Sequence, residues 1–259
     1  MIAPPTYIKN GHVSLALERR GTGLTHVLCV HGWISSRRMY FEVADRIDLH
    51  RYTLHLLDLR GAGQSDRPPE GHDLPGYVSD VRAALATIDH PVTLVGHSMG
   101  GKIAKFVGLA PPPNLQRLVL LAPGTAKGLP LDQKHRSLAL AAFGSREKIE
   151  RFQRGAMTRT LSPQIMERIV TDALIAQHEA WFGWYDTGRT ENFFDRLGEI
   201  TLPTIVMGGD RDPLAPPSNV RATVGAIPGA ISIFLKDVGH NLPIEAPAEV
   251  VQLLDRVTL

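Results

Sequence analysis

One serine in the sequence lies in a setting that suits a nucleophile. Ser98 is the centre of Gly96-His97-Ser98-Met99-Gly100, which follows an apolar run at 92–95 and precedes a segment with helical spacing at 99–110. A tight turn from strand to helix strains the serine backbone and presents its hydroxyl, provided that the residues two before and two after are small. Gly96 and Gly100 meet that condition. The alternative is a glycine-rich turn in which Ser98 only caps the helix, but the flanking elements favour a nucleophile.

A serine hydroxyl is a poor nucleophile without a base, and an imidazole base needs a carboxylate that holds its tautomer. His240 follows an apolar run at 231–235, and Asp212 follows another at 204–207. The carboxyl ends of parallel strands meet at one edge of a sheet, where Ser98 is also expected. We therefore predict a triad of Ser98 as nucleophile, His240 as base and Asp212 as the orienting acid, in the chain order that serine hydrolases use.

Strand and helix patterns alternate along the parts of the chain that must position these residues. Residues 6–19 predict a hairpin around Asn10-Gly11, since both positions tolerate positive φ. Short aliphatic runs without a polar face then predict parallel strands buried on both sides, and segments with helical spacing separate them. These strands are expected at 27–30, 53–57, 92–95, 115–121, 204–207 and 231–235, with helices at 78–88, 99–110 and 246–257. The pattern predicts a doubly wound α/β sheet.

Residues 123–197 interrupt that pattern with helical segments only, expected at 131–143, at 146–154 and after Ser162, an N-cap followed by Pro163. We interpret this stretch as a helical cap inserted into a core domain formed by residues 1–122 and 198–259. The cap holds half of the aromatic residues of the chain. An apolar substrate pocket is expected there, although the same rings could simply pack the cap helices. The candidate pocket residues are Phe143, Trp181, Phe182 and Trp184.

The sequence resembles the α/β-hydrolase-fold serine hydrolases from about residue 25 to the C-terminus. Five ordered motifs carry the resemblance: His31-Gly32 before Trp33, the segment 58–65, the turn at 96–100, the segment 209–212, and Gly239-His240 followed by Glu245 and Pro247. The resemblance implies a mostly parallel central sheet with helices on both faces and an inserted helical cap. It also implies cleavage of a carboxylic ester, lactone or thioester through an acyl-enzyme, with no metal or organic cofactor.

The resemblance assigns further residues of the site. The family places its acid about three residues after a glycine, which counts from Gly209 to Asp212 and makes Asp210 the less favoured candidate. It places the oxyanion donors at the backbone N–H groups of Trp33 and Met99. His31 is expected to organise its loop. His97 and the remaining histidines are interpreted as ordinary packing or surface residues.

Composition excludes several other classes of protein. The 259 residues are 43% apolar and 21% charged with a net charge of +2, so neither disorder nor a nucleic-acid partner is indicated. No metal motif occurs, and the segment Gly61-Ala62-Gly63 lacks the third glycine of a dinucleotide-binding loop. Neither a secretory signal nor a membrane-spanning run is visible, which predicts a cytoplasmic protein. The expected partner is a small ester-like molecule with an apolar acyl or aryl group, and no oligomeric state is predicted.

Other functions on the same fold stay open from the sequence. Carbon–carbon bond hydrolases of the family commonly have Trp after the base, where this chain has Asn241, so that activity is less favoured. Enol-lactonases, cofactor-free perhydrolases and acyltransferases need no residue that is missing here. A lyase or dioxygenase could use His240 and Asp212 with Ser98 secondary. A small-molecule receptor with negligible turnover is the non-enzyme alternative.

Overall fold

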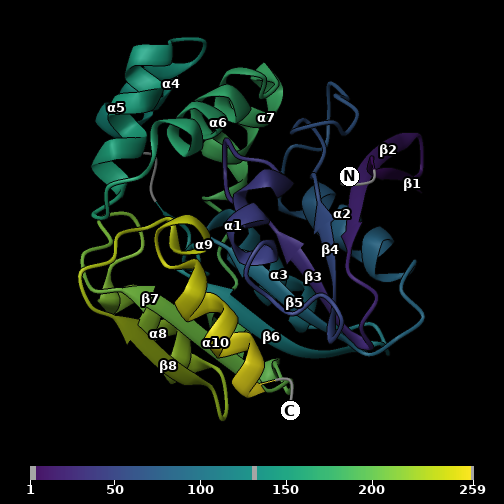
Figure 1. Cartoon of the computed structure of the whole chain (residues 1–259). Helices are drawn as coiled ribbons and strands as arrows, with labels where there is room; N and C mark the ends of the chain where they lie inside the picture. The colour runs from purple at the N-terminus through teal and green to yellow at the C-terminus, as the bar shows by residue number, and fades with distance from the viewer. Residues whose placement is uncertain (1–3, 130–132, 258–259) are drawn as a thin grey trace.

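A computed structural model describes residues 4–129 and 133–257. Its centre is an eight-stranded sheet in the order β1-β2-β4-β3-β5-β6-β7-β8 (Figure 1). Strand β2 pairs antiparallel with β1 and β4, and every other pairing is parallel. The strands are β1 (Thr6–Asn10), β2 (Val13–Arg20), β3 (Thr25–Val30), β4 (Tyr52–Leu57), β5 (Val92–His97), β6 (Leu115–Leu121), β7 (Thr204–Gly209) and β8 (Ile231–Leu235). The predicted mostly parallel sheet is confirmed.

Both faces of the sheet are buried because side chains alternate between two apolar clusters. In β3, Leu28 and Val30 belong to one cluster, while Val27 and Cys29 belong to the other. The first cluster includes residues of α2 (Leu74–Leu85), α3 (Met99–Gly108) and α8 (Pro217–Ala226). The second includes residues of η1 (Arg37–Tyr40), α1 (Phe41–Ala44), α9 (Leu242–Glu245) and α10 (Pro247–Val257). Helices on both sides therefore explain why these strands lack a polar face.

Between β6 and β7 the described residues form only helices and loops. These helices are α4 (Gln133–Ala142), α5 (Arg146–Ala156), α6 (Pro163–Leu174), α7 (His178–Gly183), the π-helical turn η2 (Trp184–Gly188) and the 3₁₀ helix η3 (Phe194–Glu199). Helices α4 to α7 lie together above the sheet in Figure 1. Ser162 caps α6 as expected, accepting the N–H of Ile165. The expected start of the first helix, at 131–132, lies outside the described residues.

One local expectation needs correction, and some helices were not predicted. The hairpin loop is Gly11-His12, because Asn10 pairs with Val13 inside the ladder and only Gly11 has a positive φ, of 60°. Helix α8 was not predicted, because Pro216-Pro217 and a weakly periodic sequence hide it. The short α1 was also not predicted; four residues are too few for periodicity to show. Within the described ranges, no helix is long and apolar enough to cross a membrane.

Candidate active site

Strand β5 and helix α3 meet at Ser98 in a turn with strained backbone. Ser98 has φ 52° and ψ −112°, a conformation that L-residues rarely adopt. The close approach depends on two glycines. A Cβ on Gly96 would lie 2.3 Å from the carbonyl oxygen of Gly100, and one on Gly100 would lie 2.4 Å from that of Val30. The sequence folds this way locally because no larger residue fits at either position.

The loops after β7 and β8 bring Asp212 and His240 to Ser98. The Nε2 atom of His240 lies 2.9 Å from Ser98 Oγ, and its Nδ1 atom lies 2.8 Å from Asp212 Oδ2. The carboxylate fixes the tautomer: Nδ1–H donates to Asp212, so Nε2 is free to accept the serine proton. The three side chains thus form one chain of hydrogen bonds, in which a carboxylate orients an imidazole toward a serine hydroxyl.

Asp212 is held as an anion at this position. Burial alone would raise its pKa, but the hydrogen bond and charge of His240 and the backbone N–H groups of Ala215 and Leu214 together lower it. Those N–H groups lie 2.8 and 2.7 Å from Oδ1. Asp210, the less favoured acid, is exposed and accepts the N–H of Asp237 at 2.7 Å. Geometry therefore pairs His240 with Asp212.

The two expected oxyanion donors flank Ser98. Met99 is the first residue of α3, and Trp33 lies in the loop after β3. Neither backbone N–H donates a hydrogen bond within the described part of the chain. Both donors are therefore available to an anion that develops beside the serine. The indole N–H of Trp33 donates to the carbonyl oxygen of Trp181 in α7 at 3.0 Å, which holds the loop against the inserted helices.

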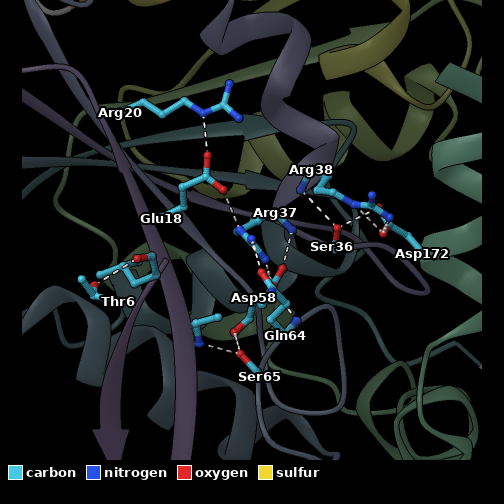
Figure 2. A network of polar contacts seen from close by, with 12 residues as sticks. Thr6, Glu18, Arg20, Ser36, Arg37, Arg38, Asp58, Gln64, Ser65 and Asp172 are labelled. Atoms are coloured by element: carbon cyan, nitrogen blue, oxygen red, sulfur yellow. Dashed lines mark hydrogen bonds and ion pairs between the residues drawn. The ribbon is translucent and has the colours of Figure 1, made fainter. Parts of the chain in front are cut away.

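Buried charges hold the segment 31–38, which carries Trp33 and is called the oxyanion loop below, against the core (Figure 2). Asp58, fully buried after β4, accepts the backbone N–H of Arg37 at 2.7 Å and also pairs with the Arg37 guanidinium. The same guanidinium donates to Glu18 at 2.9 Å. A buried cation between two buried carboxylates is costly to disturb, because removing it leaves Asp58 without an ion-pair partner in the described chain, although Glu18 keeps the guanidinium of Arg20 at 2.6 Å. This network explains the carboxylate that opens the sequence segment 58–65.

On its other side, the same loop is bound to α6. Asp172 accepts the hydroxyl of Ser36 at 2.7 Å and Nε of Arg38 at 2.9 Å (Figure 2). Asp172 is 4% exposed, so these bonds are shielded from water. The loop that carries Trp33 is thus fixed by the core and by the inserted helices together.

Two histidines near the site have structural contacts. Leu59 N–H donates to Nε2 of His31 at 3.1 Å, so Nδ1 carries the proton and donates to the Gly32 carbonyl at 2.7 Å, in keeping with the expected loop-organising role. His97 is more than an ordinary packing residue. Its Nε2–H donates to the backbone carbonyl of His240 at 2.8 Å, and burial, with the charge of His240, lowers its pKa to about 3. His97 is therefore a neutral ring that anchors the backbone of His240.

The sequence was also compared with known proteins. The model of the alpha/beta hydrolase family matches residues 27–253. The chain belongs to this family. It is 29% identical to the AB hydrolase superfamily protein YisY of Bacillus subtilis, over 81% of this chain and 82% of that protein. It is 26% identical to the pimeloyl-[acyl-carrier protein] methyl ester esterase of Aeromonas salmonicida, over 93% of this chain and 98% of that protein. The esterase EaEST of Exiguobacterium antarcticum has the same fold, with a TM-score of 0.90, 22% identity and coverage of 98% and 99%.

In this hydrolase, Glu245 joins the inserted helices to residues 236–241, the loop that carries His240 and is called the base loop below. The sequence motif did not reveal this role. Its Oε2 accepts the N–H groups of Thr158 at 2.7 Å, Arg159 at 3.0 Å and Gly239 at 3.2 Å, and its Oε1 accepts that of Asn241 at 3.0 Å. The carboxylate is 4% exposed. Its acceptors therefore fix the residues on both sides of His240.

The cavity at Ser98 differs from the predicted aromatic pocket. The empty space between its walls is about 480 Å³, which includes space open to solvent. Its lining includes Phe152 and Gln153 of α5, Ile169 of α6, Leu214 of the loop after β7 and Ile244 of α9, beside residues of the loops that carry Trp33 and His240. Sequence reasoning missed Gln153, although the pattern Ile149, Gln153, Ala156 places one amide on the buried face of a charged helix.

The four predicted pocket residues lie elsewhere. Trp181 lines a second cavity, which shares Trp33 with the first, and its indole N–H donates to the carbonyl oxygen of Ala139. Phe143 packs against Trp181 and Phe182, with ring centroids 5.4 and 5.6 Å apart respectively. Trp184 belongs to the core cluster beneath. These rings fill the spaces between short helices and the core, which accounts for the aromatic enrichment.

The site offers no cluster of metal ligands in the described ranges, where no three His, Cys, Asp or Glu side chains are placed to hold an ion. Its chemical groups are a serine hydroxyl, an oriented imidazole and two free N–H donors. Such an arrangement is suited to acyl transfer.

Proposed function

We propose that this protein is a serine hydrolase that cleaves carboxylic esters of small molecules through an acyl-enzyme. The observation that carries the proposal is the chain of two hydrogen bonds from Ser98 Oγ through His240 to Asp212, at 2.9 and 2.8 Å. The likeness to an esterase of Aeromonas salmonicida supports the same reaction type. The apolar lining of the cavity favours a substrate with an apolar acyl or aryl group.

The reaction follows from the positions of these groups. Ser98 Oγ attacks the ester carbonyl carbon while His240 Nε2 takes its proton, and the N–H groups of Trp33 and Met99 stabilise the oxyanion. His240 then returns the proton to the departing alkoxide, which leaves as the alcohol. A water molecule, deprotonated by His240, attacks the acyl-enzyme; His240 then returns that proton to Ser98 Oγ as the carbon–Oγ bond breaks and the carboxylic acid leaves. Asp212 remains ionised throughout and stabilises the imidazolium.

The test is a burst assay with p-nitrophenyl esters of increasing acyl length. We expect Ser98→Ala to lower kcat by about 10⁶-fold, since the nucleophile is lost, and Asp212→Asn by about 10⁴-fold, since the base takes the wrong tautomer. Asp210→Asn is the matched control and should retain nearly full activity. Equal losses in the two aspartate variants would contradict the assignment of the acid, and full turnover by Ser98→Ala would contradict the nucleophile.

The same assay separates the alternatives. A receptor would bind ligand without a burst or turnover and would not consume a fluorophosphonate at Ser98. A lyase would lose activity in His240→Ala but retain it in Ser98→Ala. Perhydrolase and acyltransferase activities would appear as faster acyl release when hydrogen peroxide or an alcohol is added.

We further propose that residues 123–197 act as a cap over the site, since its helices contact both the oxyanion loop and the base loop.

A further inference from the structure

Two amide side chains lie together in the mostly apolar cavity beside Ser98. Gln153 comes from the buried face of α5, and Asn241 directly follows His240. Both line the same cavity as Ser98 and His240, and they are only 7% and 5% exposed. Buried amides are costly unless they are hydrogen-bonded. Their partners therefore show what they are for.

One hydrogen bond between the amides fixes their orientation. Asn241 Nδ2 donates to Gln153 Oε1 at 3.1 Å. The remaining groups are Gln153 Nε2, which is a donor, and Asn241 Oδ1, which is an acceptor. Neither has a hydrogen-bond partner among the residues that the structure describes. The pair thus keeps one donor and one acceptor for a molecule that enters the cavity.

The chemistry of the triad indicates which part of an ester meets this pair. His240 Nε2 must return its proton to the departing alkoxide, so the alcohol part of the ester lies beside His240. The acyl carbon is bonded to Ser98, and its oxygen faces the N–H groups of Trp33 and Met99. Asn241 directly follows His240 and lines the same cavity, so we assign the amide pair to the side of the alcohol.

We propose that Gln153 and Asn241 form a polar subsite that selects esters whose alcohol part carries a carboxamide. The amide NH₂ of Gln153 donates to the carboxamide oxygen, and Asn241 Oδ1 accepts its N–H. The inference rests on the proposed function. It assigns a role to Asn241, the residue that distinguishes this chain from the carbon–carbon bond hydrolases.

The experiment compares two esters of equal size. Carbamoylmethyl butanoate has a carboxamide where isobutyl butanoate has two methyl groups, so the ratio of their kcat/KM values measures recognition of the carboxamide. The intrinsic reactivity of the two alcohols cancels when the ratio in a variant is divided by the ratio in the wild type. We expect Gln153→Leu to lower the ratio about 10-fold, as the loss of the substrate hydrogen bonds implies.

Two further variants guard against indirect effects. Gln153→Glu keeps an acceptor for Asn241 Nδ2 but replaces the free donor with an acceptor, so it should lower the ratio at least as far. Phe152→Leu, in the same helix and cavity, should change both esters by the same factor. Labelling of Ser98 by a small fluorophosphonate at the wild-type rate would show that Gln153→Leu leaves the triad in place.

The outcomes separate this inference from the proposed function. An unchanged ratio in both Gln153 variants, with wild-type labelling of Ser98, would overturn the subsite while leaving the hydrolase standing. Hydrolysis of neither ester, with no labelling of Ser98, would overturn the proposed function itself. Methyl succinamate against methyl 4-methylpentanoate tests the acyl side: a carboxamide preference there, lost in Gln153→Leu, would refute the placement on the alcohol side.

Discussion

Glu245→Gln tests whether one buried carboxylate holds the base loop and the inserted helices together. The substitution preserves shape but removes the charge and one acceptor. If the amide oxygen takes the place of Oε2, it keeps the N–H groups of Thr158, Arg159 and Gly239. The amide nitrogen then faces the N–H of Asn241, so two donors oppose each other.

The size of the effect follows from these four bonds. Leaving the buried N–H of Asn241 unpaired costs about 2–3 kcal/mol, and weakening three charge-assisted bonds to neutral ones costs about 1 kcal/mol each. Removing a buried charge recovers part of this, since its desolvation penalty disappears. We expect a net loss of about 3 kcal/mol in the free energy of unfolding.

Urea unfolding followed by circular dichroism at pH 7.5 measures this loss. With an m-value of about 3 kcal/mol/M, the midpoint should fall by about 1 M. Glu249→Gln is the matched control, because Glu249 pairs with Arg159 at 2.8 Å on the surface and should contribute less than about 1 kcal/mol. A midpoint for Glu245→Gln within about 0.3 M of the wild type, or equal shifts in the two variants, would refute the reasoning.

Three further changes test other parts of the structure. Gly100→Ala places a methyl group 2.4 Å from a backbone oxygen, so soluble, folded protein should be lost; a wild-type circular dichroism spectrum would contradict the packing. Arg37→Met leaves the carboxylates of Glu18 and Asp58 without their shared cation. Urea unfolding should show that the free energy of unfolding falls by about 3–5 kcal/mol. A fall of less than about 1 kcal/mol would show that this ion-pair network contributes little to stability. Burial, followed by the charge of a neighbouring histidine, lowers the pKa of His55 from 6.5 to about 4. The unfolded chain therefore binds that proton more readily, so the free energy of unfolding falls as the pH drops from 6.5 to about 4. His55→Gln should flatten this part of the pH dependence of the urea midpoint. An equal slope in the variant and the wild type would disprove the prediction.

The sheet could be predicted, and the three residues of the proposed triad could be named, because local rules mark them in the sequence. Buried parallel strands must be apolar on both faces, which makes 92–95 and 115–121 visible as runs. Ser98 needs glycines at fixed offsets, and the contacts of Gly96 and Gly100 show the steric reason. The apolar runs and the spacing of the glycines each extend over a few residues, so the sequence alone displays these patterns.

The lining of the cavity could not be predicted, because it depends on how the inserted helices lie on the core. Aromatic residues indicated a pocket, yet Phe143 and Phe182 fill space among the helices and Trp184 packs into the core. The side chains that do face Ser98 from α5 include a phenylalanine and an amide, Phe152 and Gln153. Composition records which residues a segment contains but not which face of a helix meets the site.

The contacts of the inserted helices carry a consequence for catalysis. They bind the oxyanion loop through Asp172 and Trp181, and the base loop through Gln153 and the N–H groups that Glu245 accepts. The carbonyl of Ala156 also accepts the backbone N–H of His240 at 2.8 Å. A displacement of these helices would therefore break bonds to the oxyanion loop and to the base loop together. Docking of the inserted helices and assembly of the site are thus coupled, and each stabilises the other.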